Sequence, residues 1–253
     1  MGKLEIRDLN QSFAKDDGSR LVVLDNISFD VRDKEFVCIL GSSGCGKTTL
    51  LRLIAGLDEA QSGSIDLDGT EIRGTSPKVG MVFQEYSLFP WRTVIDNIAF
   101  GLEMQGIAKD ERYRIAERYL NLVNLAQFRD SYPSELSGGM RQRVAVVRAL
   151  ALDPVLLLMD EPFGALDAQT RNMLQKELLD IWEATRKTVI FITHSVDEAV
   201  YLADRIIVLT PRPGRICRMV PIDLPRPRDR TSMVFAQVRR EVLDLINQNC
   251  SIQ

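Results

Sequence analysis

Histidine, cysteine and tryptophan are all scarce in this chain. Its 253 residues include one histidine, four cysteines and two tryptophans. Cys38, Cys45, Cys217 and Cys250 show no CxxC or other metal-ligand spacing, so their pattern does not indicate a zinc or iron–sulfur site. We expect all four to be free thiols in a reducing cytosol.

A membrane-spanning segment and a signal peptide are also missing from the sequence. A spanning helix needs about 20 mostly apolar residues. The best apolar run here, VLLLM at 155–159, is flanked by Asp153 and Asp160. The first residues, MGKLEIRDLNQSF, are charged from the third position and lack the apolar centre of a signal peptide. We therefore expect a soluble protein without a leader.

The chain has no large excess of charge of either sign. Thirty-two Lys and Arg residues stand against 35 Asp and Glu residues, which gives a net charge of −3. This balance argues against nucleic acid as a partner of the whole surface. An apolar fraction of 45% with 26% charged residues is typical of a globular chain and excludes extended disorder.

The hydrophobic pattern predicts an α/β fold. Residues 4–13, 21–31 and 62–69 alternate between polar and apolar side chains, and turn signals separate them, which indicates antiparallel strands. Buried parallel strands are predicted from four continuous apolar runs, which lie at 35–40, 155–159, 189–192 and 206–209. Helical patterns separate the later runs, so we expect a mixed sheet whose parallel strands are flanked by helices.

The middle of the chain, 93–152, contains no strand-like run. Apolar residues in TVIDNIAFGLEMQ and ERYRIAERYLNLVNL follow helical spacing. We interpret 93–152 as a helical subdomain inserted into a core made of 1–92 and 153–210, within one domain that spans 1–253.

The last part of the chain, 211–253, has an unusual composition. Residues 211–227 hold five of the ten prolines, and six arginines lie between Arg212 and Arg230. We interpret this stretch as an irregular, solvated surface segment. Contact with anionic lipid headgroups or with a regulatory anion is the alternative. An amphipathic helix from about Met233 to Ile246 is predicted to follow.

The segment GSSGCGKT fits the phosphate-binding pattern G-x4-G-K-[ST]. A predicted strand precedes it and a helical pattern, TTLLRLIAGL, follows, which is the context that a P-loop requires. Its glycines allow backbone N–H groups to converge on phosphate oxygens, and the helix N-terminus adds a positive dipole. A glycine-rich turn without a ligand is the alternative. The predicted ATP contacts are Gly41, Ser42, Ser43, Gly44, Cys45, Gly46, Lys47, Thr48 and Thr49.

Within the P-loop, Lys47 is expected to reach the β- and γ-phosphates, and the Thr48 hydroxyl is expected to ligate Mg²⁺. A second magnesium ligand should be an acid at the end of an apolar strand, and Asp160 follows such a run. Glu161 comes next, where a carboxylate could polarise an attacking water as a general base. A solvated strand end is the alternative for both acids.

Two further polar residues follow apolar runs. His194, the only histidine, comes just after the run at 189–192, at the strand end where ligands bind in open α/β sheets. There it could contact the γ-phosphate or the attacking water, although a lone histidine is often only structural or exposed. Gln84 follows the short run at 79–83, and its amide could bind both Mg²⁺ and a water.

A second possible anion cradle lies in SYPSELSGGMRQRVAVVRAL, residues 131–150. There a Ser-Gly-Gly turn leads into a helical pattern, and 95 positions separate Gly41 from Leu136, the residue before this turn. One bound nucleotide does not explain two such loops in one chain.

Taken together, these segments resemble the ATP-binding cassette (ABC) family over Leu4 to about Leu209. In chain order, the family's motifs match the aromatic Phe13, Walker A at 41–48, the Q-loop Gln84, the signature LSGGM at 136–140, Walker B at 156–161, the D-loop GALD at 164–167 and the switch histidine His194. The resemblance implies that Phe13 stacks on adenine, with a smaller apolar contact from Val22 as the alternative. One departure from the common LSGGQ is Met140, which we interpret as a subfamily mark.

The resemblance also implies partners. In an isologous dimer each signature would face the other chain's P-loop, so that Ser137, Gly138, Gly139, Met140 and Asp167 serve the partner's ATP. A homodimer is the simplest such pair. Separate transmembrane permease subunits would contact the Q-loop region, through Tyr86, Leu88, Phe89 and Trp91, for which core packing is the alternative. The chain would then lie on the cytoplasmic side of the membrane, with ATP and Mg²⁺ bound and a solute-binding protein as an indirect partner.

Wider phrases, such as LFPWRTVIDNIAFGL and LSGGMRQRV, resemble the importer branch for nitrate, sulfonates, taurine, bicarbonate and related small anions. An importer for another small organic solute, such as a thiamine precursor, is the alternative. A non-transport ABC ATPase that acts on ribosomes or DNA would usually carry two fused cassettes or a long coiled coil. A metabolic P-loop kinase would leave the signature unexplained.

Overall fold

The computed structural model describes residues 2–16, 18–164 and 166–247. The chain divides into two compact units: unit 1 contains 1–76 and 188–253, and unit 2 contains 77–187. Among the helices in the described ranges, none combines the length and the apolar character needed to cross a membrane.

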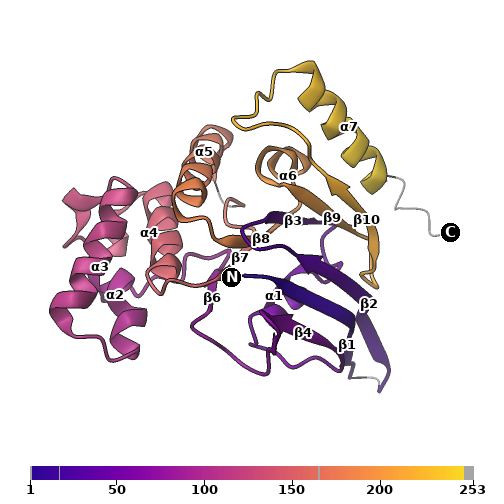
Figure 1. Ribbon diagram of the computed structural model, residues 1–253, viewed down its shortest axis with the longest axis horizontal. Helices are drawn as coiled ribbons and strands as arrows, with labels where there is room; N and C mark the ends of the chain where they lie inside the picture. The colour runs from indigo at the N-terminus through magenta and orange to yellow at the C-terminus, as the bar shows by residue number, and fades with distance from the viewer. Residues whose placement is uncertain (1, 17, 165, 248–253) are drawn as a thin grey trace. The chain divides into compact units, whose positions relative to one another are not determined.

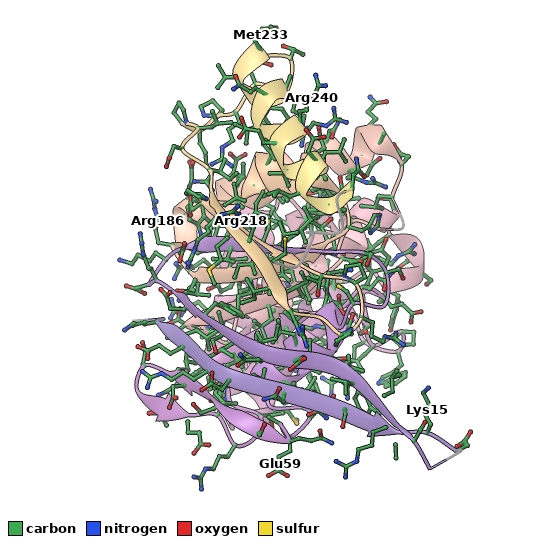
Figure 2. All side chains as sticks on the ribbon, turned by 90° about the vertical axis from the view of Figure 1, so that its right-hand side faces the viewer. Lys15, Glu59, Arg186, Arg218, Met233 and Arg240 are labelled. Carbon is green, nitrogen blue, oxygen red and sulfur yellow. The ribbon has the colours of Figure 1, made fainter. Side chains whose placement is uncertain are left out.

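Unit 1 contains an antiparallel sheet with the strand order β2-β1-β4-β5. Its strands are β1 (Leu4–Ala14), β2 (Arg20–Val31), β4 (Ser62–Leu67) and β5 (Thr70–Glu71). Buried and more exposed positions alternate along much of β1 and β2, as the period-two pattern predicts, but register shifts between Ile6 and Ser12 interrupt the alternation. Figure 2 shows the long β1–β2 hairpin, with Lys15 near its tip.

The remaining strands of unit 1 run in the order β10-β9-β3-β8. Strand β3 (Phe36–Leu40) is buried along its whole length and pairs in parallel with β8 (Thr188–Thr193) on one side and β9 (Arg205–Leu209) on the other. Helices of this unit are α1 (Lys47–Ile54), α6 (Val196–Leu202) and α7 (Met233–Asn247). Continuous apolar runs therefore form parallel strands here because both faces of the sheet are covered.

The segment after β9 differs from its predicted irregular form. Residues 216–221 form β10 (Ile216–Pro221), an edge strand antiparallel to β9. A proline at the end of an edge strand is tolerated because its missing N–H faces no partner strand. The predicted helix near the end is confirmed as α7, and Figure 2 shows it with Met233 at its first turn, where that side chain is 87% exposed.

The solvated interpretation is wrong for Arg228, although several of its neighbours, such as Pro227 and Asp229, are exposed. Arg228 is only 7% exposed, and its guanidinium donates hydrogen bonds to five backbone carbonyls. These carbonyls belong to Val200, Tyr201 and Ala203 near the end of α6, and to Ile222 and Leu224. Burial lowers the pKa of Arg228 to about 10. The guanidinium is stable in this buried position because it donates hydrogen bonds to the carbonyls at the C-terminus of α6, where the negative end of the helix dipole also favours a positive charge.

The expectation of free thiols is confirmed for two cysteines, both buried in unit 1: Cys38 and Cys45. It is wrong for Cys217, which is disulfide-bonded. Spacing along the sequence does not reveal which segments the fold brings together, so this bond could not be read from the pattern. The prediction for Cys250 lies outside the described residues.

Unit 2 combines one strand pair with four α-helices in its described part. Strands β6 (Val79–Val82) and β7 (Leu156–Asp160) pair in parallel. The helices are α2 (Val94–Met104), α3 (Lys109–Leu122), α4 (Gly138–Leu150) and α5 (Ala168–Thr185), with short 3₁₀ turns at Ala126–Phe128 and Pro133–Glu135. Figure 1 shows α2, α3 and α4 side by side, and they occupy the segment for which helices were predicted.

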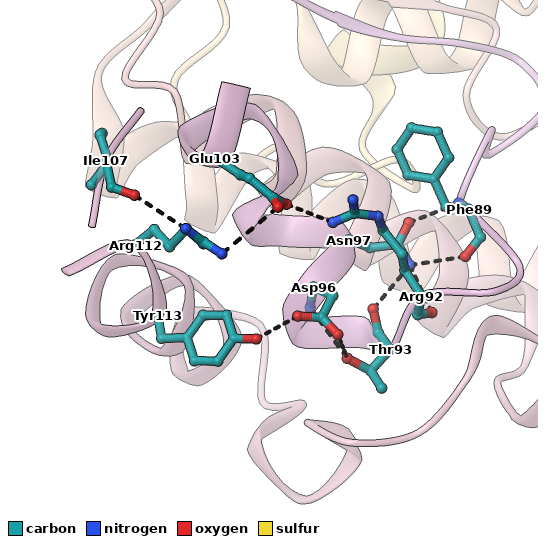
Figure 3. Close-up of polar contacts among 9 residues, drawn as sticks. All are labelled: Phe89, Arg92, Thr93, Asp96, Asn97, Glu103, Ile107, Arg112 and Tyr113. Carbon is teal, nitrogen blue, oxygen red and sulfur yellow. Dashed lines mark hydrogen bonds and ion pairs between the residues drawn. The ribbon is translucent and has the colours of Figure 1, made fainter. Parts of the chain in front are cut away.

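Polar side chains fix the first helix of this group, as Figure 3 shows. Thr93 caps α2, and Asp96 in its first turn accepts hydrogen bonds from the hydroxyls of Thr93, at 2.7 Å, and Tyr113, at 2.6 Å. A second link is the ion pair between Arg92 and Glu103, at 2.7 Å. These contacts join α2 to α3 and to the loop before α2.

Candidate functional site

The P-loop of unit 1 connects β3 to α1. Two of its glycines have positive φ angles, 78° at Gly44 and 100° at Gly46, which caps the N-terminus of α1. A Cβ atom on Gly46 would lie 2.7 Å from the Leu24 Cδ2 atom, so only glycine fits there. The Lys47 side chain is buried and its Nζ donates to the carbonyls of Gly41 (2.9 Å) and Ser42 (3.1 Å). This geometry is that of a phosphate-binding loop.

The outer surface of the loop is open to an anion. Ser42, Ser43 and Thr48 are exposed and lie at the N-terminus of α1, where the helix dipole favours an anion. Cys45 is buried; burial raises the pKa of its thiol, while the nearby positive charges of Lys47 and Arg212 act in the opposite direction. The loop therefore combines a positive potential with donors that face outward.

His194 leaves the same edge of the sheet as the P-loop. In the parallel pairing of β3 and β8, Leu40 is opposite Thr193, so the next residues along are Gly41 and His194. The His194 side chain is exposed. Hydrogen bonds of the flanking residues hold the backbone on both sides of His194. Ser195 N donates to Thr193 Oγ1 at 3.0 Å, and Ser195 caps α6. The strand order thus brings the P-loop and the lone histidine together, as predicted from the run at 189–192.

Phe13 and Val22, the two predicted adenine contacts, lie on the β1–β2 hairpin. Each is 45% exposed, which is unusual for large apolar side chains and leaves their surfaces accessible to a base. The next residues of β2, Val23 and Leu24, touch the P-loop at Gly46, so Val22 adjoins the loop along the strand.

Gln84 and the two acids follow the parallel strands of unit 2. Asp160 ends β7 and is 7% exposed. Val82 pairs with Met159, so Gln84 and Glu161 leave this strand pair at the same edge. A Cβ atom on Gly164 would lie 3.7 Å from Gln84 Nε2 and 4.0 Å from Glu161 Oε2. The polar ends of both side chains therefore lie close to Gly164. An amide and two carboxylates thus gather at this edge.

The signature segment forms the N-terminus of α4. Ser137 is exposed and caps the helix, accepting a hydrogen bond from Met140 N at 3.3 Å, and Gly138 and Gly139 make up its first turn. A Cβ atom on Gly138 would lie 3.2 Å from the Tyr86 hydroxyl oxygen, so little room exists for a larger residue. This helix end therefore carries a hydroxyl and backbone N–H groups toward solvent, the arrangement of an anion site.

Asp167 caps the next helix, α5. Its Oδ1 accepts from the backbone N–H groups of Thr170 (3.0 Å) and Gln169 (3.1 Å), and these hydrogen bonds lower the pKa of its carboxyl. Part of the predicted D-loop, Ala165, lies outside the described residues. Asp167 itself is exposed.

The predicted permease contacts lie on the loop before α2. Trp91 is 73% exposed, whereas Tyr86, Leu88 and Phe89 are half-buried. The Phe89 ring packs in tilted arrangements against Phe100 and Trp91, with ring centroids 4.5 Å and 5.7 Å apart. Tyr86, Leu88 and Phe89 are therefore partly packed against the protein, whereas Trp91 faces solvent.

Two residues that the sequence analysis missed hold this loop in place. Asn97 is fully buried in α2, and its amide donates to the carbonyls of Phe89, Arg92 and Thr93, as Figure 3 shows for Phe89. The guanidinium of Arg148 donates to the carbonyls of Tyr86 and Ser87. A polar residue inside the apolar pattern of α2 was the only sequence signal for Asn97.

A P-loop between a buried parallel strand and a helix defines a P-loop nucleotide-binding protein. The family model described as ABC transporter matches residues 24–164, and the chain belongs to this family. It is an ATP-hydrolysing, nucleotide-binding subunit of the kind whose hydrolysis powers transport.

Similar proteins agree with this assignment. An uncharacterized ABC transporter ATP-binding protein of Methanocaldococcus jannaschii is 56% identical over 96% of this chain and 91% of its own length. The nitrate import ATP-binding protein NrtD of Synechocystis is 52% identical over 94% of this chain and 89% of its own. The aliphatic sulfonates import ATP-binding protein SsuB of Bacillus cereus is 45% identical over 99% of this chain and 98% of its own.

A solved structure gives the same fold. It is the dimeric post-hydrolysis state of an ATP-binding cassette bound to ADP and Pi, with a TM-score of 0.76 and 29% identity. The match covers 88% of this chain and 100% of that one. The predicted α/β fold of a P-loop NTPase is confirmed.

Proposed function

We propose that this chain is the ATPase subunit of an importer for a small anion, of the nitrate, sulfonate or taurine, or bicarbonate class. Two relatives named for nitrate and aliphatic sulfonate import support this class, since each aligns with more than nine tenths of the chain. An importer for another small organic solute, such as a thiamine precursor, is the alternative. Solute contacts would lie in other subunits.

ATP binding is assigned to the P-loop. The backbone N–H groups from Gly41 to Thr49 would hold the phosphates, with the hydroxyls of Ser42 and Ser43 and the ammonium of Lys47 as further donors. Phe13 would stack on adenine, or Val22 would make a smaller contact. The exposed side chains of Phe13 and Val22 support this assignment.

Hydrolysis is assigned to a magnesium ion and three polar side chains. Thr48, Asp160 and Gln84 would hold Mg²⁺, since hydroxyl, carboxylate and amide oxygens are the ligands that it prefers. When bound, the ion neutralises charge on the phosphates. Glu161 would take the proton of the attacking water, and His194 would contact the γ-phosphate or this water.

A second copy of the cassette completes the site. The observation that carries this proposal is the helix end at the exposed Ser137, in a chain that already has a full P-loop. In a two-fold dimer, Ser137, Gly138, Gly139, Met140 and Asp167 would contact the ATP of the other chain, and both contacts would form at once. Hydrolysis would then open the dimer, because the γ-phosphate no longer joins the two chains.

Membrane permease subunits are assigned to the loop around Trp91. The exposed ring of Trp91 beside a hydrogen-bonded loop supports this assignment, since tryptophan is enriched at protein interfaces. Tyr86, Leu88 and Phe89 would form the floor of that contact. With these partners, the chain would lie at the cytoplasmic face of the membrane.

The class of solute is tested on the solute-binding protein encoded beside this chain. That protein is purified and titrated calorimetrically with nitrate, taurine, an alkanesulfonate, bicarbonate and a thiamine precursor. Binding of one of the anions supports the proposal. Binding of only the thiamine precursor would show that the alternative is correct, and a genome with no permease gene nearby would argue against import.

A further inference from the structure

A third loop reaches the nucleotide edge of unit 1, and neither the motifs nor the predicted site includes it. Strand β9 runs parallel to β3, with Leu40 opposite Val208. The loop after β9, residues 210–215 with the sequence TPRPGR, therefore leaves the sheet at the edge where the P-loop begins. Ligands of open parallel sheets bind at this carboxyl edge.

Hydrogen bonds make this loop rigid. Thr210 is 5% exposed; its backbone N–H donates to the carbonyl of Arg215, and its hydroxyl donates to the carbonyl of Pro213 at 2.8 Å. Gly214 exchanges backbone hydrogen bonds with β2: its N–H donates to Val23 O at 2.8 Å, and its carbonyl accepts from Asp25 N at 3.0 Å. The position of residues 211–213 is thus fixed from both ends.

The loop packs directly on the P-loop backbone. A Cβ atom on Gly214 would lie 2.2 Å from the carbonyl oxygen of Cys45, so the close approach requires glycine. Arg212 Nε donates to the carbonyl of Gly44 at 3.0 Å. A Cβ atom on Gly44 would lie 2.9 Å from Arg212 Nη2, which places the guanidinium against the loop at a residue with φ of 78°.

Within the described ranges, the charge of Arg212 has no carboxylate partner. Arg215, in the same loop, forms an ion pair with Asp25. Arg212 makes its hydrogen bond to Gly44, and no carboxylate of the described residues forms an ion pair with it. Its side chain is exposed, so its remaining N–H donors can reach a ligand. A rigid loop thus holds an arginine beside a phosphate-binding loop, and the described part of the chain supplies no carboxylate to pair with it.

We propose that Arg212 is a further nucleotide-binding residue, whose guanidinium donates hydrogen bonds to phosphate oxygens of the nucleotide in the P-loop. Arginine is suited to this role because its planar fork matches phosphate oxygens and its charge is permanent. The Nε bond to Gly44 orients the fork before the nucleotide arrives, so little side-chain entropy is lost on binding. This inference rests on the assignment of ATP to the P-loop.

The test is the equilibrium binding of a fluorescent ATP analogue with Mg²⁺ to the full chain and to three variants. Arg212→Ala should raise the Kd about tenfold, the loss expected for a charge-assisted hydrogen bond. Arg212→Lys should show a smaller increase. Arg218→Ala is the matched control, because Arg218 is exposed on β10 (Figure 2) and this substitution also removes one positive charge. The Kd of the Arg218→Ala variant should differ from that of the wild type by less than about twofold.

Each outcome has a distinct meaning. If the wild-type chain binds no ATP analogue, the nucleotide assignment itself fails. If the wild type binds but Arg212→Ala and Arg218→Ala give the same Kd, the Arg212 proposal alone is overturned.

Thermal unfolding shows whether a change in Kd comes from damage to the fold. The Arg212→Ala variant should keep the wild-type Tm. A raised Kd that is accompanied by a lowered Tm would contradict the proposal. An ATPase rate that responds to added inorganic phosphate in the wild type but not in Arg212→Ala, with equal ATP affinity, would show a free-anion site instead.

Discussion

Leu40 at the end of β3 pairs with Thr193 at the end of β8, and this register sets Gly41 and His194 side by side along one edge of the sheet. Gly41 and the single histidine of the chain are 153 positions apart in sequence, yet two parallel strands that are neighbours in the sheet bring them to the same edge. A histidine at this place can contact the phosphate chain of a bound nucleotide but lies outside the loop that holds it. Binding and hydrolysis should therefore depend on it differently.

Replacement of His194 by alanine is expected to slow hydrolysis while ATP still binds. General acid–base or electrostatic help at the γ-phosphate is typically worth a rate factor of about 10²–10⁴. We expect kcat to fall by roughly a hundredfold or more in His194→Ala, with a Kd for MgATP within a few-fold of wild type. Single-turnover hydrolysis and fluorescent ATP binding measure the two quantities. Equal losses in both would place His194 in binding instead.

Glu161→Gln is expected to bind ATP and to accumulate as a dimer. The amide keeps the shape of the side chain but cannot accept the proton of the attacking water, so the ATP-bound state persists. Analytical ultracentrifugation with millimolar MgATP measures the association. Glu183→Gln, a change at an exposed position of α5, is the matched control and should behave as wild type. A Glu161→Gln variant that stays monomeric would count against an ATP-joined dimer.

Acid should remove part of the stability that Asp96 provides. Burial alone would raise the pKa of this carboxyl, but hydrogen bonds from Tyr113 and Thr93 outweigh it, so its pKa is lowered. A lowered pKa in the folded state means that the stabilisation is present above the unfolded pKa, about 3.9, and is lost as pH falls through the folded value. The free-energy difference between wild type and Asp96→Asn should therefore be largest at neutral pH and should shrink below about pH 4.

Urea unfolding at a series of pH values measures this difference. Asp244→Asn, at an exposed position of α7, serves as the control and should follow the wild-type pH profile. A difference between wild type and Asp96→Asn that stays constant from pH 7 to pH 3 would contradict the role of the two hydrogen bonds.

The buried guanidinium of Arg228 is expected to matter for stability. Arg228→Met keeps much of the side-chain volume but removes every donor to the five carbonyls, several of which end α6. Leaving such buried acceptors without donors should cost about 2–4 kcal/mol in the free energy of unfolding. Arg240→Met, at the exposed position labelled on α7 in Figure 2, should change it by less than about 0.5 kcal/mol. Similar losses in both variants would contradict this account.

The sequence predicted those parts of the fold where local pattern and burial agree. Alternating residues formed β1 and β2, and the continuous runs formed β3, β7, β8 and β9, each within one or two residues of the predicted bounds. The P-loop was predictable because its glycines, Lys47 and the flanking elements lie within one short segment. Its chemistry depends on local backbone geometry more than on distant contacts.

Residues whose role depends on distant contacts could not be predicted. Arg228 looked like a solvated charge, because nothing in its own segment reveals the carbonyls of α6 that accept its hydrogen bonds. The helical pattern of 93–105 gave Asn97 no role, although its amide holds the loop around Phe89. Arg212 lies 168 positions from Gly44, and only the parallel pairing of β9 with β3 brings the two loops together.

The shared ATP site is tested most directly by mixing two inactive variants. Lys47→Ala removes the P-loop lysine, and Ser137→Arg blocks the signature, so each homodimer should hydrolyse almost no ATP. In a mixed dimer, the intact P-loop of the Ser137→Arg chain faces the intact signature of the Lys47→Ala chain. Random exchange should make about half of the dimers mixed, each with one complete site, and so restore about a quarter of the wild-type ATPase rate if the two sites work independently. An ATPase rate no higher than that of either variant alone, in a mixture where cross-linking demonstrates mixed dimers, would contradict a site built from two chains.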